Sequence, residues 1–206
     1  MHFLSNSFTF VINGDWNKLY TQPVWIATNI FGIEELQVEL NLVGIDYNIR
    51  YRKDDIIIQP SQNQFIFTCT SWNSEIIKYF ESICRKFIEC AVTPTVGSYG
   101  YNVSFIDDDT VKYSRIVDKI GDLEELAKSG IEVLNTELKR LIRYNGSVLH
   151  VVNNIINNKL ITSFNQHHNN ELGLQPEIPS DDMINFKNNC HDILQSNGFV
   201  VEELED

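Results

Sequence analysis

Hydrophobic and polar residues alternate through much of the first third of the chain, as they do in strands with one buried face. The alternation starts at residues 7–12 (SFTFVI) and stops at the turn residues Asn13-Gly14-Asp15. It resumes from Leu36 to Thr70, interrupted only by turn-forming residues, in the segments LQVELNLVG, YNIRYRK, DIIIQPS and QFIFTCTS. We expect these segments to form an antiparallel meander.

Two segments around this meander have helical spacing instead. Pro23 can begin a short helix that Gly32 would end. The clearest helix covers about residues 74–91, because its apolar side chains recur three and four residues apart. They are Ile76, Ile77, Phe80, Ile83, Cys84, Phe87, Ile88 and Ala91. This apolar side should cover the sheet, and Pro94 prevents the helix from continuing.

The second half repeats the succession of strand and helix patterns. A strand is predicted over 96–106, and a helix over 114–129 with Gly130 as its stop. Three further strands are predicted at 134–144, 147–153 and 159–165. Asn145-Gly146, between the first two of these, is a strong hairpin signal.

The last predicted helix follows a loop that contains two prolines. Ser180 is its expected N-cap, Asp181 and Asp182 lie favourably in its first turn, and Gly198 ends it. The fold class is therefore α+β: an antiparallel sheet packed against a few helices, with strands-then-helix organisation stated twice. We expect one domain over 1–206, or two lobes (1–106 and 114–201) about a seam near 107–114, with an acidic tail at 202–206.

Glycine and asparagine inside the 96–106 strand make a structural prediction of their own. Glycine in a strand marks a bulge or a close approach of another backbone, so Gly100 should occupy such a position. Asn102 should tether a neighbouring segment through its amide.

Charge narrows the classes of partner. The chain has 28 acidic and 16 basic residues and a formal net charge of −12. Such a surface repels phosphate backbones, which disfavours nucleic acid, and suits a soluble acidic protein or one with a basic partner.

No apolar run is long enough to span a bilayer, and the four cysteines form no CxxC pair. We expect a cytoplasmic protein that binds no membrane and needs no cofactor.

Two groups of residues are candidate metal ligands. Asp107, Asp108 and Asp109 are consecutive, so a regular strand would point them to opposite faces. His167 and His168, with Cys190 and His191, have no zinc-finger or ribbon spacing. We expect no metal and assign no catalytic residue, but a metal-dependent hydrolase or nuclease built on these groups stays an alternative.

Basic residues concentrate in two strand segments that also contain tyrosines. The basic residues are Arg50, Arg52 and Lys53 in one segment and Lys139, Arg140 and Arg143 in the other; the tyrosines are Tyr47, Tyr51 and Tyr144. Basic and aromatic side chains together resemble a stacking surface for a nucleotide or single-stranded nucleic acid, which is a second alternative. Cross-strand pairing with carboxylates explains the same residues structurally.

Several short motifs resemble those of a widespread, uncharacterised family of small soluble bacterial proteins. They are Pro23 with Trp25, Thr93-Pro94, Gly100 with Asn102, and Asn165 with His167. They lie within FTFVINGDWNKLYTQPVWIATNIFGIEEL, IIIQPSQNQFIFTCTS, TPTVGSYGYNVSF and LITSFNQHHNN, and the resemblance covers about four fifths of the chain. The resemblance implies a shared fold and no particular chemistry.

The sequence therefore favours binding over catalysis. Eleven per cent of the residues are aromatic, and Tyr20, Trp25, Trp72 and Tyr101 lie near predicted element ends, where they can anchor an interface or belong to the core. We expect a binding or scaffold protein in a bacterial protein complex or homo-oligomer. The predicted binding residues are Trp25, Tyr101, Asn102, Arg140 and Arg143.

Overall fold

A computed structural model describes residues 1–43, 46–91, 95–108, 129, 135–157, 159–170 and 176–202. Its strands are β1 His2–Phe3, β2 Phe8–Gly14, β3 Gln37–Val43, β4 Asp46–Lys53, β5 Ile56–Pro60, β6 Gln64–Cys69, β7 Val96–Asp107, β8 Asn135–Tyr144, β9 Ser147–Ile156 and β10 Lys159–Asn169. Its helices are the 3-10 helix η1 Lys18–Thr21, the α-helices α1 Pro23–Ile26, α2 Ser74–Cys90 and α5 Asp182–Ser196, and the π-helix η2 Ala27–Phe31.

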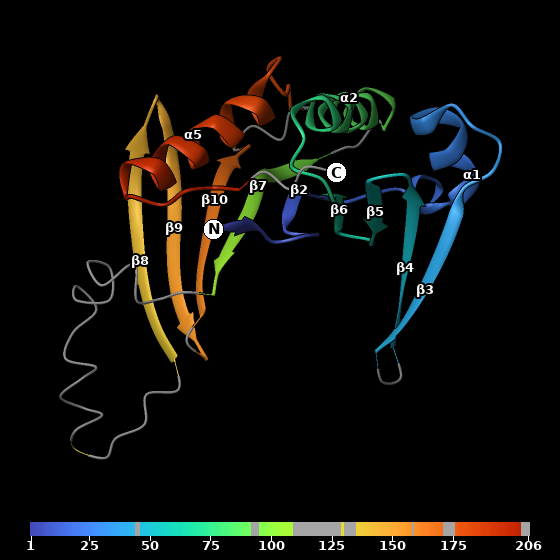
Figure 1. Ribbon diagram of the computed structural model, residues 1–206. Helices are drawn as coiled ribbons and strands as arrows, with labels where there is room; N and C mark the ends of the chain where they lie inside the picture. The colour runs from blue at the N-terminus through green and yellow to red at the C-terminus, as the bar shows by residue number, and fades with distance from the viewer. Residues whose placement is uncertain are drawn as a thin grey trace.

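These strands form one ten-stranded sheet in the order β3-β4-β5-β6-β2-β7-β10-β9-β8, and β1 also pairs with β7. Every strand pair is antiparallel. The central pair joins distant parts of the chain, since Phe10 of β2 lies opposite Tyr101 of β7. Figure 1 shows the sheet curving, with β3–β4 and β8–β9 extending beyond the helices at its two ends.

The helices α1, α2 and α5 lie on the same side of the sheet (Figure 1). Alternate residues of the strands face them, and these residues form the core with the apolar side of α2. The α2 residues Phe80 and Phe87 mark the contact: Phe80 lies 5.6 Å from Phe8, and Phe87 lies 4.6 Å from Phe65, between ring centroids. The predicted role of the 74–91 helix as a cover for the sheet is confirmed.

A carboxylate of α2 caps the N-terminus of α5. Glu81 is only 5% exposed, and its two oxygens accept hydrogen bonds of 2.9 Å from the backbone N–H groups of Asp181 and Met183. The N-cap residue is Asp181, in the left-handed region, and its own side chain makes no capping bond. The prediction of Ser180 as N-cap is therefore wrong: the orphan N–H groups are satisfied from another helix.

Turn chemistry was predicted well. Gly32 follows η2 with a φ of 68°, and Asn145 and Gly146 both have positive φ between β8 and β9, as a two-residue hairpin turn requires.

The predicted helix over 114–129 and the seam near 107–114 lie almost wholly outside the described residues. Residues 203–206 also lie outside them, but Glu202 bridges His2 and is not a free tail residue.

The α+β class, with an antiparallel sheet and packed helices, is confirmed. Among the described residues, no helix has both the length and the hydropathy needed to cross a membrane.

Candidate binding face

The sheet has one face on the side away from the helices, and we call it the open face. Cross-strand register identifies its residues: Thr9 lies opposite both Thr68 and Asn102, and Asn102 lies opposite Asn165. Continuing these rows across the sheet gives Gln37, Glu39, Asn48, Arg50, Arg52, Ile57, Gln59, Gln64, Ile66, Thr68, Thr9, Val11, Asn13, Ser98, Gly100, Asn102, Ser104, Ile106, Lys159, Ile161, Ser163, Asn165, His167, Asn169, Val148, His150, Val152, Asn154, Ile156, Glu137, Lys139, Leu141 and Arg143.

Side-chain amides and hydroxyls are hydrogen-bonded to one another across the centre of the open face. Asn165 Nδ2 donates to Asn102 Oδ1 at 2.8 Å, and Asn102 Nδ2 donates to Thr9 Oγ1 at 3.1 Å. The hydroxyls of Ser104 and Ser163 lie 2.8 Å apart. This centre is polar and uncharged.

A second row of the same kind crosses the open face nearer the ends of its central strands. Gln64 Nε2 donates to Asn13 Oδ1 at 2.8 Å, and Asn13 Nδ2 donates to Ser98 Oγ at 3.0 Å. Side chains held by neighbours lose less conformational entropy on binding than free ones, so the rows present a preorganised polar surface.

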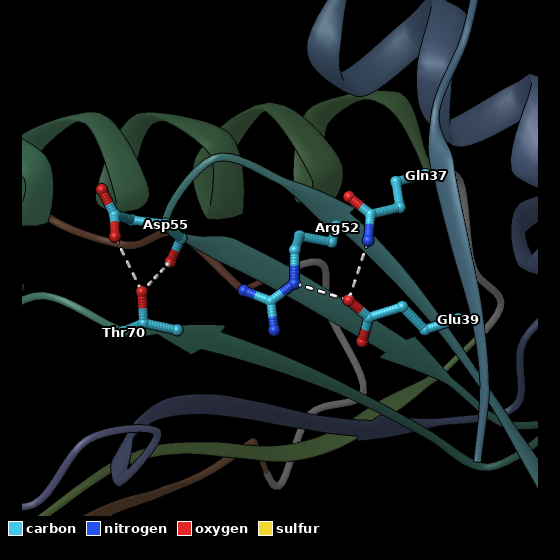
Figure 2. Close-up of polar contacts among 5 residues, drawn as sticks. All are labelled: Gln37, Glu39, Arg52, Asp55 and Thr70. Carbon is cyan, nitrogen blue, oxygen red and sulfur yellow. Dashed lines mark hydrogen bonds and ion pairs between the residues drawn. The ribbon is translucent and has the colours of Figure 1, made fainter.

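Two arginines extend from β4 at one end of the open face. Arg52 Nε donates to Glu39 Oε1 at 2.6 Å, and Gln37 supports the same oxygen at 3.2 Å, as Figure 2 shows. Arg50 Nε donates to the neutral Gln59 Oε1 at 3.0 Å. In both cases the bond uses Nε, so the guanidinium retains further donors for a ligand.

The β4–β5 turn beside these arginines is fixed to β6. Thr70 Oγ1 donates to Asp55 Oδ1 at 2.8 Å and to the Asp55 carbonyl at 3.3 Å, as Figure 2 shows. The Thr70 N–H also donates to this carbonyl, at 2.9 Å. The turn therefore positions β4 and its arginines firmly against the rest of the sheet.

Opposite β4, the far end of the open face is formed by β8. Lys139 pairs with Glu137 at 2.8 Å, and Arg143 is exposed. Among the described residues, neither Arg143 nor Arg50 has a carboxylate partner. Counting described strand side chains, the open face has five Lys or Arg residues (Arg50, Arg52, Lys139, Arg143 and Lys159) and two Glu residues, although the whole chain has a net charge of −12.

Of the residues predicted to bind a partner, Asn102 lies at the centre of the open face and bonds to both neighbouring strands. Tyr101 faces the other way and is fully buried; its hydroxyl donates to Asp182 Oδ2 at 2.7 Å. Burial, with the nearby Asp182 carboxylate, raises the pKa of Tyr101. Tyr101 presents no surface to a partner, so its predicted interface role is wrong.

The other predicted anchor residues also pack against the hydrophobic core. The rings of Tyr20 and Trp25 lie 4.7 Å apart and pack against the core, and Trp25 lies 6.2 Å from Phe87. Trp72 is buried between Phe3 and Phe105. Trp72 therefore belongs to the core, whereas Tyr20 and Trp25 are half-buried at its edge, and the binding role of Trp25 stays a prediction.

Strand alternation places Arg50, Arg52, Lys139 and Arg143 on the face opposite to Tyr51 and Tyr144. Tyr51 lies between Arg50 and Arg52 in sequence but faces the helices, 2% exposed, with its hydroxyl bonded to the Thr21 carbonyl. Tyr144 bonds Asp192 of α5, also on the helix side. The described side chains therefore do not form the predicted aromatic and basic stacking surface on the open face, and the side chain of Tyr47 lies outside the described ones. For the same reason Arg140 faces α5 while Arg143 lies on the open face.

The candidate metal ligands are spread apart in the described part of the chain. Asp107 pairs with the Met1 ammonium at 3.2 Å and Asp108 with Lys159 at 2.8 Å, while Asp109 lies outside the described residues. His167 is exposed on the open face, and His168 stacks on Tyr99 on the other face. The described residues contain no cluster of three or more His, Cys, Asp or Glu side chains suited to a metal.

The buried cysteine thiols are poor nucleophiles. Burial raises the pKa of Cys69 to about 11 and raises the pKa values of Cys84 and Cys190. A raised pKa keeps the thiol protonated near neutral pH, which opposes nucleophilic catalysis.

Neither a protein-family model nor a curated protein matches this chain. The resemblance to a bacterial family therefore stays a prediction.

Proposed function

We propose that this protein is a non-catalytic binding protein and that its open face binds an acidic segment of a partner protein. The observation that carries the proposal is the pair Arg50 and Arg143, one at each end of the open face, with no carboxylate partner among the described residues. On a chain with a net charge of −12, such a surface selects an anionic ligand by local complementarity.

The spacing of these arginines suits an extended segment. Seven strand-to-strand steps separate β4 from β8, which is roughly 34 Å at about 4.8 Å per step. An extended chain rises about 3.3 Å per residue, so about ten residues would reach from one arginine to the other. The amide and hydroxyl rows between them offer donors and acceptors for the backbone of such a segment.

Nucleic acid is the less suitable anion. A polyphosphate is repelled by the remaining acidic surface, and single-stranded binders use aromatic side chains on which bases stack. The described residues of the open face include no Phe, Tyr or Trp ring. Sparse carboxylates on a peptide need only a few cations, which is what the open face provides.

The proposal is tested by fluorescence anisotropy with a labelled acidic decapeptide of alternating Glu and Ser. The parent protein is compared with the double variant Arg50→Gln/Arg143→Gln. The matched control is Lys18→Gln/Lys78→Gln, which removes the same charge from exposed helical positions. We expect the arginine variant to bind at least about tenfold more weakly, since a hydrogen bond to a charged group contributes about 1.5–3 kcal/mol. The control should bind like the parent.

Two results would contradict the proposal. Equal weakening in both double variants would mean that only net charge matters. Tighter binding of a single-stranded oligonucleotide than of the peptide at about 0.15 M salt, where long-range charge is screened, would make nucleic acid the partner. Sedimentation of the protein alone tests self-association: a dimer disrupted by the same arginine variant would make a second copy the partner.

We also propose that the two halves share one layout of strands followed by a helix. The support is the strand order, in which β6 and β10 flank the central pair β2–β7 and are followed in sequence by α2 and α5. Four unpaired cysteines suit the reducing cytoplasm, where we propose that the protein acts.

A further inference from the structure

A cavity of about 280 Å³ lies between α5 and the β8–β10 end of the sheet, on the side away from the open face. Its floor is formed by side chains of β8, β9 and β10, and its roof by the last turn of α5 and the residues after it. The principal lining residues are Arg140, Asn153, Thr162, Phe164, Ile193 and Phe199. Its volume is close to the lower end of the range for ligand pockets, about 300–1,000 Å³.

Two hydrogen-bond donors in this cavity lack acceptors. Among the described residues, Arg140 makes no ion pair or hydrogen bond. Asn153 is 3% exposed, and its Oδ1 accepts a 2.8 Å bond from Thr162 Oγ1, while no described residue accepts a hydrogen bond from its Nδ2 group. Arg140 is half-buried and Asn153 is buried. Buried polar groups are usually paired, so a ligand that supplies acceptors would suit these two donors.

The two donors can reach one ligand group. Arg140 of β8 lies opposite Val151 of β9. Asn153 is two residues beyond Val151 on β9 and therefore on the same face. Such diagonal neighbours are about 7–8 Å apart, a span that one carboxylate can bridge between two long side chains.

The end of α5 does not need Arg140. The last carbonyls of a helix attract cations, but here the Ile193 carbonyl already accepts bonds from Asn197 and Ser196, and the Leu194 carbonyl accepts from Asn197 and Phe199. The negative end of the helix dipole disfavours a negative charge close to it, so the charge of a ligand would lie on the β8 side and its apolar part beneath the helix.

We infer that this cavity binds a small aliphatic monocarboxylate, with its carboxylate between Arg140 and Asn153 and its chain against Phe164, Ile193 and Phe199. This site is independent of the open face. Arg140 and Arg143 belong to the same strand but to opposite faces, which lets the two functions be tested separately.

The test is titration of the full chain with octanoate, followed by calorimetry and by ¹H–¹⁵N NMR, with octan-1-ol as the uncharged analogue. Arg140→Gln should weaken octanoate at least about tenfold while its melting and circular dichroism stay close to the parent's. Arg140→Lys, which keeps the charge, should recover part of the affinity. Arg143→Gln is the matched control and should bind octanoate like the parent. Ile193→Phe, which fills the cavity from a half-buried position, should block octanoate and octan-1-ol alike.

The inference is overturned if octanoate fails to bind at millimolar concentration, or if octan-1-ol binds as tightly and Arg140→Gln changes nothing. It is also overturned if NMR shifts caused by octanoate fall on the open face. Loss of acidic-peptide binding in Arg143→Gln with unchanged octanoate binding would confirm that the two sites are separate.

Discussion

Asn165 donates a 2.8 Å hydrogen bond to Asn102 across the β7–β10 pair, and Asn102 in turn donates to Thr9 on β2. One amide thus connects three central strands on the open face. Replacing Asn102 with Ala leaves Thr9 and Asn165 each without a partner, so we expect a loss of about 1–3 kcal/mol in the free energy of unfolding.

Urea melts provide the measurement for this change. Asn48→Ala, at an exposed position of the same face, is the control and should stay within about 0.5 kcal/mol of the parent. If Asn102→Ala melts like the parent yet loses the acidic peptide, its amide contacts the ligand and contributes nothing to the sheet.

Gly100 allows the backbones of β7 and β10 to approach closely. A Cβ at this position would lie 2.7 Å from the Gln166 carbonyl oxygen, which belongs to the backbone and cannot turn away. We expect Gly100→Ala to cost about 1–3 kcal/mol by overpacking. Gly97→Ala, three residues earlier on the same strand, meets nothing within 4 Å and should cost far less. Equal melting midpoints for the two variants would rule out this steric role.

Most strands and the long helix were predictable because their periodicity is local. Alternation also implies that residues an odd number of positions apart on a strand face opposite ways, which separates Arg140 from Arg143 and Tyr101 from Asn102. Among the uncharged residues of the open face, Asn102 and Asn165 belong to the short motifs, whereas Thr9, Ser104 and Ser163 gave no such signal. Alternate polar positions on β2, β7 and β10 could have indicated them.

Long-range contacts could not be predicted from the sequence. The pairing of β2 with β7 and the capping of α5 by Glu81 join residues about ninety to a hundred positions apart in sequence. No local pattern indicates which strands are neighbours in the sheet. From its spacing alone, Glu81 is an ordinary polar residue on the outer side of its helix.

Glu81 makes the most specific of these contacts. Glu81→Gln keeps the shape but removes the charge that faces the α5 N-terminus, and one of its two acceptor oxygens becomes a donor. We expect a loss of about 1–3 kcal/mol, with faster hydrogen exchange at the Met183 amide. Glu89→Gln, exposed on the same helix, should be nearly neutral. Unchanged exchange at Met183 would contradict the capping role.

His168 makes stability depend on pH. Burial against Tyr99 lowers the pKa of His168, and the Asp182 carboxylate opposes only part of that effect. Below the unfolded pKa of about 6.5 the unfolded chain therefore binds more protons at this residue than the folded one. The free energy of unfolding should fall as pH decreases from about 6.5 through the lower folded pKa.

Urea melts at pH 7.5 and 5.0 test this dependence. His168→Phe retains a ring against Tyr99 and removes the titrating group, so its loss of stability between the two pH values should be smaller than the parent's. The same loss in both proteins would assign the acid sensitivity to other groups.

Binding of an acidic segment to the open face is tested most directly by the side-chain amide signals of the protein in ¹H–¹⁵N NMR, during titration with the Glu-Ser decapeptide. The amides of Asn13, Gln64, Asn102 and Asn165 lie on the open face, whereas Asn188 is exposed on α5. We predict saturable shifts for the open-face amides and none for Asn188, with the shifts lost in Arg50→Gln/Arg143→Gln. Shifts centred on α5, or open-face shifts that persist in the arginine variant, would contradict the proposed binding face.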